Sequence, residues 1–345
     1  MKLSFATLQD TEKLMKFLDE HWKKDHILSQ DKNLFLYEFQ EGERLNFGIA
    51  KDADGEILGL FGFMKYNSLS LPDLAGSLWK VKDDCKVPLL GLKLREFVVN
   101  NIKHRFFAAP GAGIQTKPIY QIIKMDWNQM EQYYFPNPTI KDFQILKLPD
   151  SLKKTHLQEK NVNEQIKINK VKEIDELQQF DFKKYQNIVP FKDLSYIQKR
   201  FVNHPIYSYD IYTVKKEKRI ENIFICRSVD TVDSKAYRIV DFYGFENNMD
   251  SIVRFLSTFI IENKYEYFDF LCHGFNKDKM LSAGLYNVDF ESEVVVPNFF
   301  EPFVQKNIPV YCVSDRIEES NMHFRQCKAD GDQDRPNRYR SSDEQ

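Results

Sequence analysis

The chain repeats one order of predicted elements, and this repetition constrains its fold more than any other feature. Residues 45–127 are expected to form three strands, a helix, a short strand and a second helix. Residues 209–290 repeat that order at nearly the same spacing. Duplication of a β-β-β-α-β-α unit predicts a tandem α/β (α+β) fold with two mixed sheets. A cleft where ligands bind is expected between the copies.

The elements of the two copies follow from alternating apolar positions in strands and helical spacing in helices. In the first copy we expect strands at 45–52, 57–67, 77–84 and 105–109, a helix at 88–102, and a helix that ends in Lys-Met-Asp-Trp at 124–127. In the second copy we expect strands at 209–216, 221–230, 236–244 and 267–273, with helices at 248–263 and 276–285.

The length of 345 residues suits two domains of ordinary size. We expect a first domain at residues 1–146 and a second at 165–339. The stretch 147–164 is polar and rich in Lys, Glu and Asn, which is typical of a linker. Residues 340–345 are expected to form a disordered tail.

Charge and cysteine content exclude several classes of protein. A net charge of −2 argues against a broad nucleic-acid surface. No secretory leader and no apolar run of about 18 residues is seen, so we expect a cytoplasmic protein without a membrane partner. The five cysteines are odd in number and show no CxxC spacing, which indicates reduced thiols and no zinc site.

A strand-to-helix junction in the first copy has the form of an anion site. A helix that begins directly after a strand presents free N–H groups and its positive dipole end, where a pyrophosphate can bind. Pro88 suits the first turn of such a helix. An ordinary helix start is the structural alternative. The residues predicted to form this corner are Lys86, Val87, Leu89, Leu90, Gly91 and Leu92.

Tyr120 is the candidate acid. It lies in the predicted helix that follows the loop 110–113. Its hydroxyl could protonate a leaving thiolate, since phenol and thiol pKa values are close. A core tyrosine on an amphipathic helix is the alternative.

These motifs, in this order, resemble those of the GNAT acyltransferase superfamily. Its members read (Gln/Arg)-x-x-Gly-x-(Gly/Ala) at the corner, where this chain has Lys86-x-x-Leu89-x-Gly91. They read Leu-Tyr-x-x-x-Gly-Phe on the later helix, where this chain has Ile119-Tyr120-x-x-x-Lys124-Met125. The second copy keeps Gly284 but has Met280 at the tyrosine position. The resemblance therefore implies coenzyme A binding in the first domain and acceptor binding in the second.

The whole chain resembles two-domain GNAT enzymes that N-acylate nucleotide-linked amino sugars of bacterial surface polysaccharides. The nearest resemblance is to transferases that use 3-hydroxybutanoyl-CoA and a dTDP-3-amino-3,6-dideoxyhexose. Residues 324–337 and 270–274 carry this likeness. The acyl-CoA donor and the sugar acceptor are implied by the resemblance alone.

The Asp-rich segment at 330–337 offers carboxylates for sugar hydroxyls or an ammonium and an arginine for a diphosphate. Its candidate substrate-binding residues are Asp330, Asp332, Asp334, Arg335 and Asn337. A calcium loop is disfavoured because the turn glycine and the twelfth-position glutamate are missing, so no metal is expected. A turn docked by pairing of the arginine with an aspartate is the structural alternative.

His273 ends a predicted buried strand and precedes Gly274, so it is a candidate base for deprotonating the acceptor amine. A structural histidine is the alternative. Asp83 and Asp84, before the corner, are alternative bases or acceptor-binding carboxylates. His21 and His26 are expected on the solvated edge of the first helix, without a role.

The interpretation is an acyl-CoA-dependent N-acyltransferase that works by direct attack of a sugar amine on the thioester. The alternatives are an aminoacyl-tRNA-dependent tandem enzyme and a ligand-binding pseudoenzyme. The first is disfavoured by the lack of an inserted helical hairpin and a basic stripe. A monomer is expected, since two fused copies supply what a homodimer would supply.

Overall fold

The computed structural model describes residues 1–149, 165–317 and 321–338. Contacts divide the chain into two compact units, each with segments from distant parts of the sequence. Unit 1 contains residues 1–127 and 313–316 together with the described residues from Arg335 onward. Unit 2 contains the described residues of 128–312 and 317–334. Within the described ranges, no helix is both long and apolar enough to cross a membrane.

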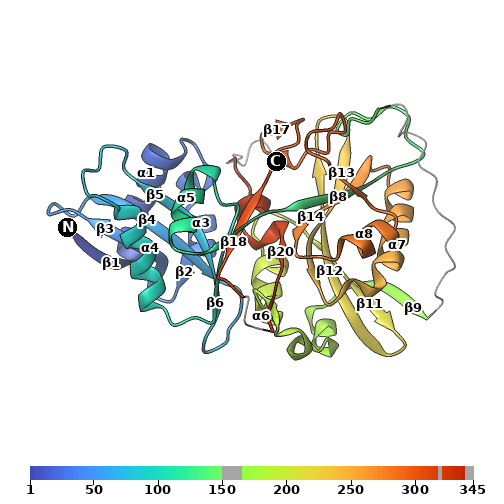
Figure 1. Cartoon of the computed structure of the whole chain (residues 1–345), viewed down its shortest axis with the longest axis horizontal. Helices are drawn as coiled ribbons and strands as arrows, with labels where there is room; N and C mark the ends of the chain where they lie inside the picture. The colour runs from blue at the N-terminus through green and yellow to red at the C-terminus, as the bar shows by residue number, and fades with distance from the viewer. Residues whose placement is uncertain (150–164, 318–320, 339–345) are drawn as a thin grey trace. The chain divides into compact units, whose positions relative to one another are not determined.

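Unit 1 is built on a mixed sheet in which the strands follow the order β1-β3-β4-β5-β6-β18-β7, with β2 beside β3 (Figure 1). The strands are β1 (Lys2–Thr7), β2 (Gln40–Glu41), β3 (Arg44–Lys51), β4 (Ile57–Lys65), β5 (Asp73–Val81), β6 (Phe106–Pro110), β7 (Asp126–Gln129) and β18 (Tyr311–Ser314). The strands from β1 to β5 pair antiparallel in that order, and β5 pairs parallel with β6.

Helices cover both faces of this sheet. One face packs against α1 (Thr11–Phe17), α2 (Ile27–Gln30) and α3 (Lys32–Phe39), through a cluster that includes Phe35 and Phe47. The other face packs against α4 (Leu90–Asn101) and α5 (Lys117–Ile122), through a cluster that includes Leu94 and Phe107. Short single-turn segments flank these helices: η1 (Leu8–Asp10), η2 (Leu18–Trp22) and η3 (Ile114–Thr116).

Unit 2 has a second sheet with the strand order β9-β11-β12-β13-β14-β8-β15, and β20 pairs with β14 outside this path. The strands are β8 (Glu131–Pro136), β9 (Ile166–Lys170), β11 (Asp210–Lys216), β12 (Arg219–Asp230), β13 (Lys235–Tyr243), β14 (Tyr267–His273), β15 (Tyr286–Asn287) and β20 (Gln326–Cys327). Two short pairs lie outside the sheet: β10 (Ile188–Val189) with β19 (His323–Phe324), and β16 (Phe299–Phe300) with β17 (Phe303–Val304).

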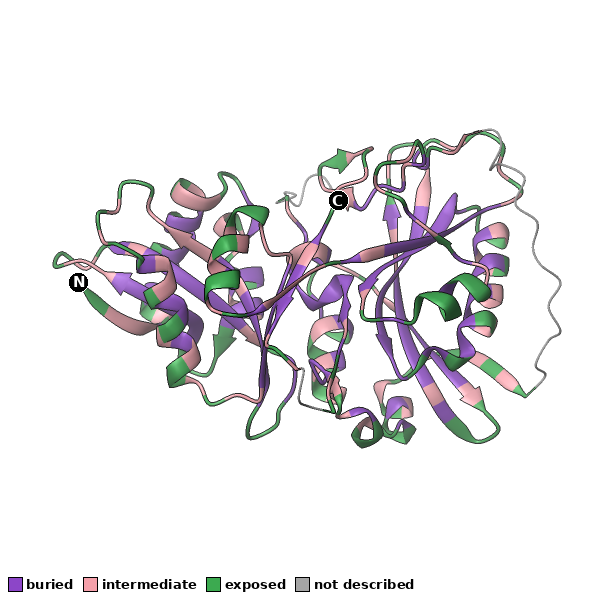
Figure 2. Cartoon of the chain, in the orientation of Figure 1, coloured by how far each residue is buried: buried purple, intermediate pink, exposed green. Residues whose placement is uncertain are grey.

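The layers of unit 2 repeat those of unit 1. One face of its sheet packs against η5 (Ile174–Gln179), η6 (Phe182–Tyr185), α6 (Leu194–Ile197) and η7 (Gln198–Val202). The other face packs against α7 (Met249–Glu262) and α8 (Lys277–Ser282). The remaining turns are η8 (Glu246–Asn248), η9 (Lys328–Asp330) and η10 (Asp332–Asp334). In both units the strands are largely buried and the helices have exposed outer faces (Figure 2).

The two sheets correspond strand by strand, and in each the sixth strand is one that follows the other repeat in sequence. In sheet order, β18 lies between β6 and β7, and β8 lies between β14 and β15. Strand β8 follows β7 in sequence but pairs with β14 over Tyr267–Pro136 to Cys272–Glu131. This exchange places residues 128–146 in unit 2, whereas the sequence-based boundary at 146 placed them in the first domain.

The predicted tandem α/β architecture with mixed sheets is confirmed by these two sheets. The expected helix end at 124–127 is wrong. Helix α5 ends at Ile122, because Lys124 adopts a left-handed backbone with φ of 59° and the Met125 N–H returns to the Tyr120 carbonyl at 2.9 Å. This reversal closes the helix and lets β7 begin at Asp126.

The exchange predicts that the first repeat does not fold alone. A fragment of residues 1–146 keeps β8 but lacks β14, its partner, and lacks β18 beside β6. We expect circular dichroism of this fragment to show no cooperative thermal transition, because both strand edges lose backbone hydrogen bonds. The full chain is the control. A fragment that melts cooperatively would contradict the exchange.

Candidate functional site

In unit 1, two parallel strands separate and leave a notch. Strands β5 and β6 pair only from Asp73–Phe106 to Ala75–Ala108, although β5 continues to Val81. Within the described residues, β4 and β6 are the strands that pair with β5. Residues 76–81 therefore present a backbone edge toward β6 that no described strand covers. We call this place the unit 1 notch. An extended ligand can pair with such an edge.

The equivalent notch in unit 2 is filled by the chain itself. Strands β13 and β14 pair only up to Ile239–Phe270. Beyond that point β20 pairs antiparallel with β14, through Cys272–Cys327 and His273–Gln326. Since β8 pairs with Cys272 on the opposite edge, β20 must lie on the edge that faces β13. We call residues 326–330, which form β20 and η9, the plug.

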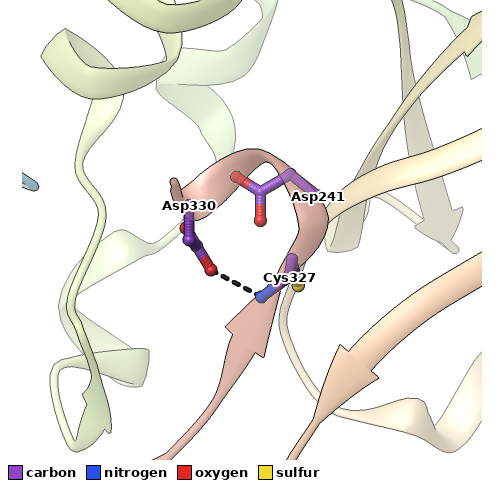
Figure 3. Close-up of side chains that lie close together, drawn as sticks. All are labelled: Asp241, Cys327 and Asp330. Atoms are coloured by element: carbon purple, nitrogen blue, oxygen red, sulfur yellow. Dashed lines mark hydrogen bonds between the residues drawn. The ribbon is translucent and has the colours of Figure 1, made fainter. Parts of the chain in front are cut away.

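Buried ion pairs hold the plug in place. Lys192 donates from Nζ to Asp330 at 2.9 Å and also to Asp241 on β13. The Asp330 carboxylate also accepts the Cys327 N–H at 2.6 Å, as Figure 3 shows. Burial would lower the pKa of Lys192, but the two carboxylates outweigh it and raise that pKa above its usual range. Burial raises the pKa of Asp330 to about 6.

Asp241, Cys327 and Asp330 have the donor set of a metal site, with ligand atoms within 4.8 Å of one another (Figure 3). Two observations favour a different reading. The Lys192 ammonium already bonds to both carboxylates, in the position a cation would take. Burial raises the pKa of Cys327 well above its usual range, which keeps the thiol protonated. The group therefore fits a lysine better than a metal ion.

Replacement of Lys192 by methionine should destabilise the protein strongly. It leaves two buried carboxylates without their counter-charge, which costs about 3–5 kcal/mol in comparable cases. We expect this loss in the free energy of unfolding measured with urea at pH 7, and a smaller loss at pH 5, where a carboxyl can take up a proton. Exposed Lys183→Met is the control. Equal stability of Lys192→Met and wild type would contradict this account.

The predicted corner of unit 1 begins helix α4 one residue after Leu89. Its first backbone bond joins the Lys93 N–H to the Leu89 carbonyl at 3.0 Å, so the N–H groups of Leu90, Gly91 and Leu92 precede it. Leu89 has φ of 55° and a side chain that is 72% exposed. Leu89 thus adopts the backbone conformation that favours glycine. Lys86 is exposed and Val87 half-buried.

Gly91 is explained by packing. The Trp79 indole N–H donates to the Gly91 carbonyl at 3.0 Å. A Cβ at Gly91 would lie 3.0 Å from the Trp79 Nε1. The absence of a side chain at Gly91 therefore lets Trp79, in the separated part of β5, approach the first turn of α4.

Tyr120 lies on α5 and is only 3% exposed. Its ring packs edge-on against Trp79 at 5.7 Å between centroids and lies 6.3 Å from Trp127. Burial raises the pKa of Tyr120 to about 12. The phenol is therefore protonated at neutral pH and can donate a proton, but its anion is poorly stabilised unless a cation is near.

Arg95 on α4 is such a cation, and sequence reasoning missed it. Arg95 is 8% exposed, its Nη2 lies 3.0 Å from the Met125 sulfur, and its guanidinium lies 5.0 Å over the Phe107 ring. Its Nε has no hydrogen-bond partner among the described residues. Burial lowers the pKa of Arg95, while the charges of Tyr120 and Asp315 oppose that shift.

A sequence signal for Arg95 did exist. Gly91, Arg95 and Val98 follow one another at helical spacing, so the arginine occupies a position on the inner face of α4. A charge at such a position is unusual, because burying an arginine without full pairing is costly.

The carboxylates before the corner lie at the surface of unit 1. Asp83 and Asp84 are exposed in the turn after β5. Asp83 accepts a hydrogen bond from Lys80 at 2.6 Å, and this bond lowers the pKa of Asp83.

His273 ends β14, as expected, and is half-buried. It lies opposite Gln326 of the plug, and its ring is 5.4 Å from that of Phe324. Burial lowers the pKa of His273, which keeps the imidazole neutral at pH 7. His273 belongs to unit 2 and Tyr120 to unit 1.

The Asp-rich segment is held largely by internal partners. Asp330 accepts a hydrogen bond from Lys192. Asp334 accepts hydrogen bonds from the Arg227 guanidinium at 2.7 Å and from the Tyr209 hydroxyl at 2.9 Å. The cations outweigh burial and lower the pKa of Asp334 below its usual range. Asp332 is half-buried and bonds to the Gln333 amide at 3.2 Å.

Arg335 and Asn337 dock the end of the described chain on α2 and α3 in unit 1. Arg335 donates to Glu38 at 3.2 Å and lies over the Phe39 ring, so the arginine pairs with a glutamate where an aspartate was expected. The Asn337 Oδ1 lies 3.1 Å from His26 Nε2.

His26 is 2% exposed, so its expected place on a solvated edge is wrong. Its Nδ1 accepts the Leu28 N–H at 3.2 Å and caps α2, which fixes the proton on Nε2, toward Asn337. Burial lowers the pKa of His26 to about 4, so the ring is neutral at pH 7.

Unit 2 has its own strand-to-helix corner, at residues 244–248. Gly244 is required there, because a Cβ would lie 2.4 Å from the Glu221 carbonyl and φ is 91°. A pocket of about 180 Å³ lies at this corner and includes Lys184 and Lys216 in its lining. The second corner therefore also has lysines beside it, and the two units differ instead in whether the notch is filled by the chain.

The sequence matches no protein-family model and no curated protein. Solved structures do match. A GCN5-related N-acetyltransferase from Anabaena variabilis ATCC 29413 superposes with a TM-score of 0.58 at 10% identity, over 91% of this chain and 72% of that one. A probable N-acyltransferase from Enterococcus faecalis V583 superposes with a TM-score of 0.55 at 8% identity, over 90% and 71%.

A third match is the GCN5-related glucosamine N-acetyltransferase region of a fungal multi-domain GH3 β-N-acetylglucosaminidase. It superposes with a TM-score of 0.51 at 13% identity, over 91% of this chain and 38% of that one. At such identities the likeness concerns the fold, and together with the duplicated layers it shows that the chain has a tandem GNAT-like fold.

Proposed function

We propose that the protein is an N-acyltransferase that moves an acyl group from acyl-CoA to the amine of a nucleotide-linked amino sugar. The observation that carries this proposal is the difference between the two notches. The unit 1 notch is uncovered by described strands and lies on the strand that carries Trp79, which packs against Tyr120. The corresponding notch of unit 2 holds the plug.

The donor would bind in unit 1. The N–H groups of Leu90, Gly91 and Leu92 at the start of α4 would hold the coenzyme A pyrophosphate. The pantetheine arm would extend along the free edge of β5, in the place that β20 takes in unit 2. This orientation brings the thioester toward Trp79 and Tyr120.

The chemistry follows from these groups. The neutral acceptor amine attacks the thioester carbonyl carbon, the carbon–sulfur bond breaks, and the thiolate takes the Tyr120 hydroxyl proton. Arg95 would stabilise the tyrosinate, offsetting the burial that raises its pKa. The nitrogen of the product amide loses its extra proton to solvent, and the role of His273, which belongs to unit 2, stays a prediction from the sequence. That proton later returns to Tyr120 through solvent.

The acceptor class rests on two supports. One is the resemblance of residues 324–337 and 270–274 to sugar N-acyltransferases. The other is the match to a region that acetylates glucosamine, an amino sugar. In unit 1, Asp83, Asp84 and Asn337 are not buried and are the candidates for direct contact; Asp332, also not buried, belongs to unit 2. Buried Asp330, Asp334 and Arg335 would support the segment from within. A 3-hydroxybutanoyl donor and a dTDP-linked deoxy sugar are the most specific form of the proposal.

Calorimetry with coenzyme A tests the donor site. We expect one molecule bound per chain, because the plug fills the second notch. Leu89→Glu should weaken binding at least about tenfold, since it places a carboxylate beside the pyrophosphate at the helix N-terminus. Leu89→Gln, of the same size and uncharged, is the matched control and should bind like wild type.

Two results would overturn the donor site. If the wild type does not bind coenzyme A, the proposal that acyl-CoA is the donor is wrong. Equal weakening by both Leu89 variants would mean that charge at this corner is not what matters.

Tyr120→Phe should lower kcat by about 100-fold and leave KM within about twofold, because the hydroxyl acts only as the thiolate leaves. The assay is thiol release from an acyl-CoA with an amino sugar nucleotide as acceptor. Exposed Tyr286→Phe is the control. An unchanged kcat in Tyr120→Phe, with the same Tm as wild type, would remove Tyr120 from the mechanism.

A further inference from the structure

Two cysteines from distant parts of the sequence lie directly opposite each other in unit 2. Cys272 on β14 and Cys327 on β20 are Cα partners in an antiparallel pair. They are 0% and 2% exposed and belong to one hydrophobic cluster. All five cysteines of the chain are free thiols.

The pairing gives the two residues the geometry of a disulfide. Directly opposite residues of an antiparallel pair have Cα atoms roughly 4.5 or 5.5 Å apart and side chains on the same face. A disulfide bridges Cα atoms about 4.4–6.8 Å apart.

The other cysteines have no such partner. Cys226 on β12 lies opposite Asp210 and Ile239. Cys312 lies on β18, and Cys85 lies in the turn before α4 and is half-buried. Among the described strands, Cys272 and Cys327 are the two cysteines in register with one another.

We propose that Cys272 and Cys327 form a redox-active dithiol whose disulfide fastens the plug in the unit 2 notch. Oxidised glutathione is a sufficient oxidant. One thiolate attacks it to give a mixed disulfide and one glutathione, and the second thiolate then displaces the other glutathione. Both thiol protons end on the two glutathione molecules, and one sulfur–sulfur bond replaces another.

The plug controls how easily glutathione reaches the two buried thiols. Burial raises the pKa of both thiols, while Lys192 opposes that shift at Cys327. Strand β20 is two residues long and pairs with β14 at Cys272, so we expect its release to make both thiols more accessible. The exchange is therefore slow while β20 is paired, and the disulfide, once formed, reacts slowly with reductants such as dithiothreitol. It also closes the long loop from 272 to 327, which restricts the unfolded chain.

The test uses the full-length wild-type protein, reduced, purified and incubated at pH 8 with oxidised glutathione. Free thiols are then alkylated and the protein is digested without reductant for mass spectrometry. Before alkylation we expect an intact mass lower by two hydrogens and a Tm several degrees higher, and after digestion a peptide linking Cys272 to Cys327. Dithiothreitol should reverse all three. Peptide mapping of the wild type needs no variant to fold.

Two cysteine variants show whether the disulfide causes the rise in Tm. Cys327→Ser should abolish both the linked peptide and the rise in Tm, and Cys312→Ser should keep both. The proposal is overturned if the wild type gains only glutathione at Cys85, or if its linked peptides join other cysteines. Because no step uses coenzyme A, these results do not depend on the proposed acyl transfer.

Discussion

The structure depends on backbone pairing at the sixth position of each sheet, which is supplied by a strand from the other repeat. Strand β14 would present a row of unpaired N–H and C=O groups without β8, and β6 would do so without β18. Neither sheet can be completed by one contiguous repeat. The exchange therefore couples the folding of the duplicated halves, and it fixes where the C-terminal segment must run. After β18 the described chain returns to unit 2 to form β20, and then ends in unit 1 at residues 335–338.

Because the C-terminal segment returns to unit 2, the two similar sheets differ at one place. Both have a pair of parallel strands that separates after three residue pairs. In unit 2 the chain fills the resulting notch with its own strand and secures it with Lys192 between two carboxylates. In unit 1 no described strand enters, and Trp79, in the separated part of β5, packs against Tyr120. Identical topology thus gives one notch filled by the chain and one that no described strand fills.

The backbone conformation accounts for two positions at which this chain departs from the GNAT sequence pattern. Leu89 and Lys124 stand where the pattern has glycine, and both adopt left-handed conformations with φ of 55° and 59°. The turn at Lys124 makes the same pair of closing bonds as that at Gly284, where Leu285 N–H returns to the Met280 carbonyl. The conformation is kept although the residue is not, at a cost of about 1–2 kcal/mol for each side chain. The surrounding packing holds these turns in place.

Periodicity in the sequence determined the duplicated order of strands and helices, including the bounds of β14. It also placed Tyr120 on a helix and His273 at the end of a strand. These features could be predicted because each depends on a local pattern. Periodicity did not determine the boundary between units, the plug or the role of Lys192, because each depends on contacts between segments that are far apart in the sequence. The same limit applies to Arg95, whose burial beside Tyr120 depends on how α4 and α5 pack. It applies also to Cys272 and Cys327, which only the register of β14 and β20 brings together. Local pattern fixed the elements, because it depends on neighbouring residues. Long-range strand pairing decided which strand edges are covered among the described residues, because it depends on the whole fold.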